Sequence, residues 1–177
     1  QPRVEKAAEE QLARTRKKAE VFTPSWIVNK MNNHCDEEWF GRPNVFNTEA
    51  GTSWVTSSAP ITFDRKLSWK GYVDSKRLEI TCGEAPYIVS RYDAATGDII
   101  PIKDRIGILD RKLRVVSENA ADDAEWLKWA ERALQSSYGY EFQGDNLLIA
   151  RGNVLHTFAE YYEARFAARP DIKLLRK

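Results

Sequence analysis

The chain has 177 residues, of which 42% are hydrophobic, and its 27 basic and 26 acidic side chains nearly cancel. This length and apolar content suffice for one globular domain with a buried core, which excludes a disordered chain as the simple interpretation. The charge balance gives no whole-chain argument for nucleic-acid binding, so any DNA contact has to come from a local patch.

Cysteine and histidine are scarce, with Cys35, Cys82 and two histidines in the whole sequence. Such numbers fit neither a disulfide framework nor a zinc cluster. No run approaches the roughly 18 consecutive apolar residues of a membrane span, and the amino-terminus lacks the apolar core of a signal peptide. We therefore expect a cytoplasmic protein with no membrane contact. Because the sequence starts with Gln1 and stops at Lys177 after an unfinished-looking segment, we also expect a fragment of something longer.

The amino-terminal forty residues are expected to be helical. Val4 to Glu20 is rich in helix-forming residues, and its basic cluster around Arg14–Lys18 leaves two interpretations open, a DNA-phosphate contact or an ordinary solvent-facing surface. Pro24 ends this helix, and Thr23–Ser25 offers capping groups for a second one from Trp26 to about Cys35. The expected inner stripe of that second helix is Ile27, Val28 and Met31.

Residues 41–76 show little periodicity and are predicted to form a loop pinned by aromatic side chains. From residue 77 the pattern changes. Leu78–Thr81 is typical of a buried strand that enters a tight turn at Gly83, and Tyr138–Phe142 is typical of a second strand. A turn at Thr96–Asp98 and helices over 105–116 and 122–135 lie between them. We expect this helical excursion, at about 95–137, to be an insertion.

A long helix capped by Asp145 should follow the second strand. Its expected apolar positions are Leu147, Leu148, Val154, Leu155, Phe158 and Tyr162. Strands that alternate with helices predict a parallel sheet with helical crossovers, so residues 77–177 are expected to form an α/β domain with a partial parallel sheet.

Two strand ends carry the residue types that bind nucleosides. A glycine turn after a strand lets the backbone approach a ligand, and an acidic side chain at a neighbouring strand end accepts hydrogen bonds from ribose hydroxyls. The first end holds Glu79 and the turn at Gly83, and the second holds Glu141. Either end alone is a weak indication, because glycine turns after strands are common.

Three stretches together resemble a known family. Val21–Val28 (VFTPSWIV) resembles the amino-terminal Phe-Thr-Pro motif of adenine-specific DNA methyltransferases of restriction-modification systems. Leu78–Tyr87 (LEITCGEAPY) is similar to the family's first cofactor motif, and Tyr138–Glu141 is similar to the next. The resemblance extends from about Ala19 to Arg169 and is nearest to type II enzymes and restriction endonuclease subunit M.

The resemblance implies a Rossmann-like methyltransferase domain that binds S-adenosyl-L-methionine. It implies that Phe22, Thr23 and Pro24 line the methionine end of this cofactor, and that Glu141 receives the ribose hydroxyls. The residues implied near its amino-acid portion are Glu79, Thr81, Cys82 and Gly83. The implied partners are double-stranded DNA, contacted through the parent protein, and a restriction subunit or fused nuclease.

The sequence also departs from the family. Ala85 stands where a second glycine is usual, which adds a methyl group where backbone and cofactor would approach. Glu141 lies 62 positions after Glu79, against roughly 20 in a plain dinucleotide-binding unit. No Asp/Asn-Pro-Pro-Tyr/Phe string, the family's methyl-transfer motif, occurs in the chain. We therefore predict no catalytic and no metal-binding residue here, and a fragment that is inactive alone.

Three hypotheses remain open. The chain is the cofactor-binding part of a DNA adenine methyltransferase, or a binding module that neither closes over cofactor nor reaches DNA, or an assembly piece of a restriction complex that docks DNA or a partner. Cofactor affinity separates the first from the others, and salt-dependent retention on DNA without cofactor affinity indicates the third.

Overall fold

A computed structural model describes residues 5–6, 23–64 and 66–175. The predicted helix over residues 4–20, apart from residues 5 and 6, and the candidate residue Phe22 lie outside them. The described part is a mixed α/β structure. Its elements are α2 (Ser25–Phe40), β1 (Asn47–Ala50), β2 (Ser53–Thr56), α3 (Trp69–Asp74), β3 (Arg77–Ile80), the 3-10 helix η2 (Ile102–Asp104), α4 (Ile108–Asn119), α5 (Asp123–Gln135), β4 (Ser137–Tyr140), α6 (Gly144–Phe166) and α7 (Ile172–Leu175).

The helix α2 is confirmed, but its buried stripe differs from the predicted one. Val28 is buried as expected, whereas Met31 is 53% exposed. The inward positions are mainly polar, namely Ser25, Asn29, Asn32 and Asp36. The reason is that Asn29 and Asp36 accept hydrogen bonds from the buried guanidinium of Arg111 on α4. A polar interface of this kind leaves no apolar periodicity in the sequence.

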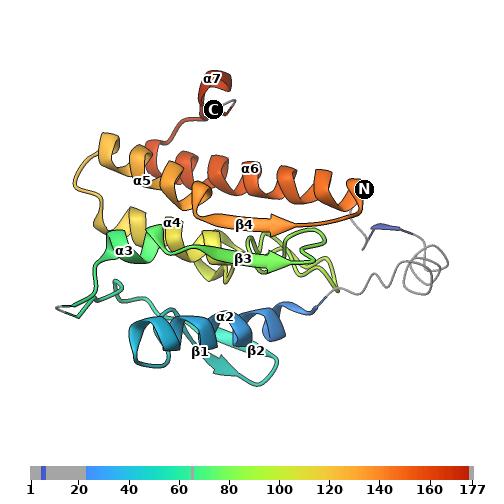
Figure 1. The fold of residues 1–177 in the computed structure, drawn as a ribbon, viewed down its shortest axis with the longest axis horizontal. Coiled ribbons are helices and arrows are strands. Elements are labelled where there is room, and N and C mark those ends of the chain that lie inside the picture. The colour runs from blue at the N-terminus through green and yellow to red at the C-terminus, as the bar shows by residue number, and fades with distance from the viewer. Residues whose placement is uncertain (1–4, 7–22, 65, 176–177) are drawn as a thin grey trace.

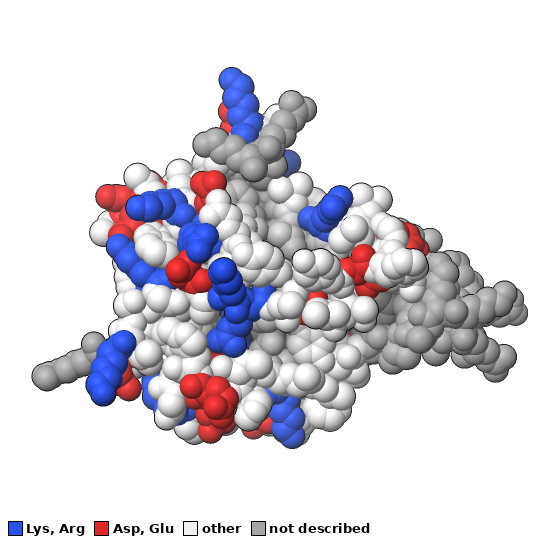
Figure 2. Space-filling view, viewed as in Figure 1, with Lys and Arg blue, Asp and Glu red and all other residues white. Residues whose placement is uncertain are grey.

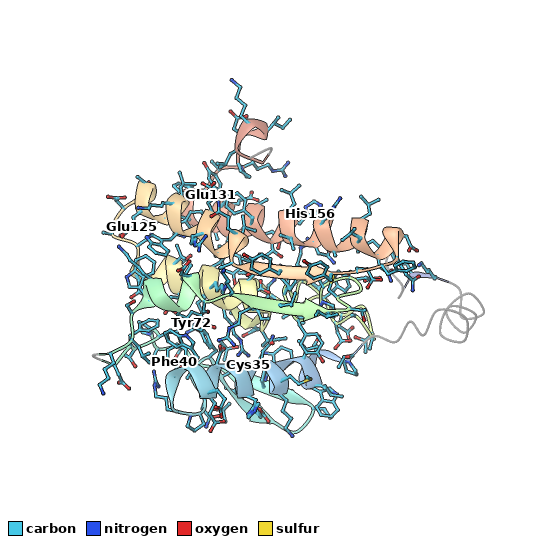
Figure 3. All side chains as sticks on the ribbon, in the orientation of Figure 1. Cys35, Phe40, Tyr72, Glu125, Glu131 and His156 are labelled. Atoms are coloured by element: carbon cyan, nitrogen blue, oxygen red, sulfur yellow. The ribbon has the colours of Figure 1, made fainter. Side chains whose placement is uncertain are left out.

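The prediction of a loop over residues 41–76 is wrong in part. This segment contains the antiparallel hairpin β1–β2 and the short helix α3. The hairpin was missed because its strands have four residues each and are largely exposed, so no alternation of apolar and polar residues marks them. The aromatic packing is present, and Figure 3 shows Phe40 and Tyr72 between α2 and α3, with ring centroids 5.2 Å apart.

The strands β3 and β4 pair in parallel, with Arg77 opposite Ser137 and Ile80 opposite Tyr140. The predicted helical excursion lies between them and forms η2, α4 and α5. Among the described residues this sheet has two strands, so a wider doubly wound sheet is not formed there. In Figure 1 α4 lies behind the pair and α6 runs alongside β4.

One face of the parallel pair packs on the core, and no described residue covers the other, which we call the bare face. On the inward face Glu79 is buried, and Gly139 lies against Cys82 and Ile88 of the core. The other face carries four large side chains that are 43–71% exposed, those of Leu78, Ile80, Tyr138 and Tyr140. In the space-filling view charges of both signs are spread around this region (Figure 2). Parallel sheets are usually covered on both faces, so this uncovered face is unusual.

The long helix α6 begins one residue before the predicted cap. Gln143 is its N-cap residue and makes no side-chain cap bond, while Asp145 lies in the first turn and pairs with Lys6. Two predicted inward positions are wrong, since Leu148 is 72% and Leu155 43% exposed. The buried face is partly polar and includes Asn146, Ala150, Asn153, Thr157 and Tyr161. Within the described part of the chain, no helix is both long and apolar enough to cross a membrane.

Candidate functional site

The two predicted strand ends meet. The Gly83 N–H donates to Glu141 Oε2 at 2.7 Å, and the Gln143 N–H donates to Glu141 Oε1 at 2.8 Å. The Cys82 N–H extends the contact by donating to the Tyr140 carbonyl at 2.7 Å. Parallel pairing of β3 and β4 is what brings Gly83 and Glu141 together at the carboxyl ends of the strands. This edge is where ligands bind in open α/β sheets.

The turn after β3 has two residues in the left-handed region, Gly83 with φ 55° and Ala85 with φ 65°. The Ala85 N–H closes the turn on the Cys82 carbonyl at 2.7 Å. Ala85 therefore adopts the conformation that favours glycine, the residue expected at this position. Its methyl group is buried and lines an apolar cavity against α6, which Gly83 does not line. We therefore place the added methyl on the cavity side of the turn.

Replacing Ala85 with glycine is expected to change stability little and in the favourable direction. A non-glycine residue in the left-handed region costs about 1–2 kcal/mol, whereas glycine adds about 0.5–1 kcal/mol of unfolded-chain entropy and removes one buried methyl. We expect a gain of up to about 1 kcal/mol, read from urea denaturation. A loss of more than about 1 kcal/mol would show that the methyl contact in the cavity outweighs the backbone strain.

Glu79 is buried under this turn, with 8% of its surface exposed. Its Oε2 accepts a hydrogen bond from the Ile88 N–H at 3.2 Å. Burial raises the pKa of Glu79 to about 8, and the nearby charge of Glu141 acts in the same direction. The side chain is therefore mainly protonated at neutral pH, and it holds the loop that follows the turn.

Cys82 and Thr81 occupy opposite environments in the turn. Cys82 is buried, and burial raises the pKa of its thiol to about 11, which keeps it protonated and favours a packing role. A Cβ placed on Gly139 of β4 would lie 3.0 Å from the Cys82 sulfur, so a side chain there would require its neighbours to shift by a few tenths of an ångström. Thr81 is exposed.

Thr23 and Pro24 are half-buried and directly precede α2. The predicted capping of this helix by Thr23–Ser25 is wrong, because its N-cap residue is Pro24 and no side chain of the segment caps it. The carboxylate of Asp93 accepts from the Ser25 N–H instead, at 2.6 Å. This contact reaches the start of α2 from a loop 68 residues away. Sequence reasoning missed Asp93 because it identified its neighbourhood only as a turn.

A second feature is the cavity of about 630 Å³ between α5, α6 and β4. Its walls are mainly apolar, with Ile88, Leu127, Leu134, Val154 and Phe158 among them. Charged side chains reach it from Lys128, Glu131 and Arg151, and Figure 3 labels Glu131 on α5. Cys82 and Ala85 of the glycine turn line this cavity, whereas Gly83 and Glu141 do not, so the cavity borders the turn and the polar strand-end contact lies outside it.

Neither metal ligands nor a disulfide stand out in the part of the chain that the structure describes. No three His, Cys, Asp or Glu side chains gather there as a metal site, and Cys35 and Cys82 are both free. No protein-family model matches the chain, and no curated protein or solved structure matches it either.

Proposed function

We propose that this chain is the S-adenosyl-L-methionine-binding part of a DNA adenine-N6 methyltransferase of a restriction-modification system. In this proposal the protein acts in the cytoplasm, and the strand ends of β3 and β4 hold the nucleoside of the cofactor. The methyl-transfer motif and the surface that selects double-stranded DNA come from outside residues 1–177. A separate restriction subunit or a fused nuclease is the expected associate.

The observation that carries the proposal is the bond between Gly83 and Glu141. These residues belong to two motifs that the resemblance links to one cofactor, and they lie 58 positions apart in the sequence. The Gly83 amide and the Glu141 carboxylate meet at the carboxyl edge of parallel strands. At such an edge a carboxylate can accept hydrogen bonds from ribose hydroxyls, and a glycine backbone can approach the ligand closely. The Rossmann-like character of the complete domain is part of the same proposal.

The bare face of the parallel pair supports an incomplete domain. Leu78, Ile80, Tyr138 and Tyr140 present a continuous apolar surface, since they occupy two facing pairs of positions in register. Exposed apolar patches of this kind mark places where other polypeptide packs. The same observation favours the second candidate function, a non-catalytic module of a restriction complex that binds a partner or DNA. Cofactor affinity separates the two.

Calorimetric titration of the chain with S-adenosyl-L-methionine tests the proposal. We expect saturable binding by the wild type and at least about a tenfold weaker affinity for Glu141→Ala, because charge-assisted hydrogen bonds contribute about 1.5–3 kcal/mol. Glu163→Ala is the matched control, since Glu163 is exposed on α6. Absence of heat at millimolar cofactor, or equal affinities for the three proteins, would favour the partner-binding module.

A further inference from the structure

A small hairpin follows the glycine turn and lies between the parts of the candidate site. Tyr92 and Ile99 form an antiparallel bridge, and the Asp93 N–H donates to the Asp98 carbonyl at 2.8 Å. The Asp93 side chain braces the bend, because its Oδ1 accepts from the N–H groups of Ala95 and Thr96. The hairpin therefore holds Tyr92 and Asp93 in fixed positions.

Each of these two side chains contacts a different part of the site. Asp93 Oδ2 accepts from the Ser25 N–H at 2.6 Å, at the start of α2. The Tyr92 hydroxyl donates to Glu84 Oε2, also at 2.6 Å, and Glu84 directly follows Gly83 in the turn. Two adjacent residues thus connect the Thr23–Pro24 segment to the glycine turn.

Asn153 connects the third part of the candidate site, helix α6, to the glycine turn and the hairpin. Its Nδ2 donates to the Glu84 carbonyl and to the Tyr92 hydroxyl, both at 3.0 Å, and it lies on α6, the helix that follows Glu141. Asn153 and Glu84 are 8% and 2% exposed. The Tyr92 hydroxyl accepts one hydrogen bond, from Asn153, and donates another, to Glu84, so both its donor and its acceptor capacity are used. A side-chain network of this kind, linked through several hydrogen bonds, favours a single geometry.

We infer that Tyr92, Asp93 and Asn153 are positioning residues that assemble the start of α2, the glycine turn and α6 into one binding site. The inference rests on the proposed function only for the identity of the ligand. The coupling of the start of α2, the glycine turn and α6 through these hydrogen bonds is independent of that function. Loss of the Tyr92 hydroxyl should loosen Ser25, which it does not touch, because the coupling runs through the shared hairpin.

Hydrogen exchange of the complete chain, with Tyr92→Phe and Asp93→Asn as separate variants, tests the coupling. We expect faster exchange in peptides that cover Ser25 and residues 82–86 in both variants, with the β1–β2 hairpin and α4 unchanged. Tyr138→Phe is the matched control, since its ring lies on the exposed face of β4. A merely structural role would raise exchange across the whole fold, and this outcome would overturn the inference.

Calorimetry with S-adenosyl-L-methionine on the same variants gives the second readout. Because one hydrogen bond is lost, we expect Tyr92→Phe to bind about three- to tenfold more weakly than the wild type. We expect the affinity of Tyr138→Phe to equal that of the wild type. If the wild type binds no cofactor, the proposed function fails and the exchange data still decide the coupling. If the wild type binds and Tyr92→Phe matches it in both affinity and exchange, the positioning role is wrong.

Discussion

Glu79→Gln should stabilise the folded protein at alkaline pH and flatten the pH dependence of its stability. The folded protein holds a proton on Glu79 up to a pKa of about 8, whereas the ordinary value is 4.5. Between these values the unfolded chain has released the proton, so wild-type stability is lost as the pH rises from about 4.5 to about 8. The neutral amide avoids this loss and still offers an oxygen to the Ile88 N–H.

The expected gain for Glu79→Gln at pH 9 is on the order of 3 kcal/mol, and it should shrink toward zero at pH 5. Urea denaturation at several pH values measures it, with Glu163→Gln on the exposed side of α6 as the control. Parallel pH profiles for wild type and Glu79→Gln would mean that Glu79 is ionised in the folded protein. Such a result would contradict the buried position of the Glu79 carboxyl group under the turn.

Arg111→Ala should be the most damaging single substitution in the interface between α2 and α4. Arg111 is 2% exposed, and its Nη1 donates to Asp36 Oδ2 at 2.6 Å while Nη2 donates to Asn29 and Asn33. Its removal leaves a buried carboxylate without its main counter-charge. Breaking a buried pair from one side costs about 3–5 kcal/mol.

Urea denaturation followed by tryptophan fluorescence measures the effect of Arg111→Ala. Arg151→Ala is the control, because this exposed arginine on α6 should change stability by no more than about 0.5 kcal/mol. The double variant Asp36→Ala/Arg111→Met should recover part of the loss, since the Asp36 carboxylate is then no longer buried without its main counter-charge. The recovery is incomplete because Arg77 and the Tyr72 hydroxyl also lose Asp36 as a partner. A cost below about 1 kcal/mol for Arg111→Ala would show that the polar interface does not hold α2 in place.

The elements that carried a clear pattern were predictable, and those held by polar contacts were not. The strand at Leu78 and the helix around Trp126 follow from apolar runs and helical spacing, and both are present. The prediction that this strand is buried is wrong, because Leu78 and Ile80 lie on its exposed face and only Glu79 is buried. The β1–β2 hairpin is too short and too exposed to leave a pattern. The inward faces of α2 and α6 were predicted only in part, because polar side chains share them with apolar ones such as Val28 and Phe158.

The candidate site divides in the same way. The meeting of Gly83 and Glu141 followed from the expectation of adjacent parallel strands. The roles of Tyr92, Asp93 and Asn153 depend on contacts between residues 61 to 69 positions apart, which no spacing rule predicts. Phe22 lies outside the described residues, so its place beside the cofactor stays a prediction.

Titration of isotopically labelled protein with S-adenosyl-L-methionine, followed by amide resonances, tests the central claim most directly. A ribose that takes up the carboxylate of Glu141 has to disturb the two amides that now donate to it, those of Gly83 and Gln143. We predict saturable shifts at these two amides and at Ser25. Saturating cofactor that leaves all three resonances in place, or shifts only those around the cavity between α5 and α6, would contradict the account.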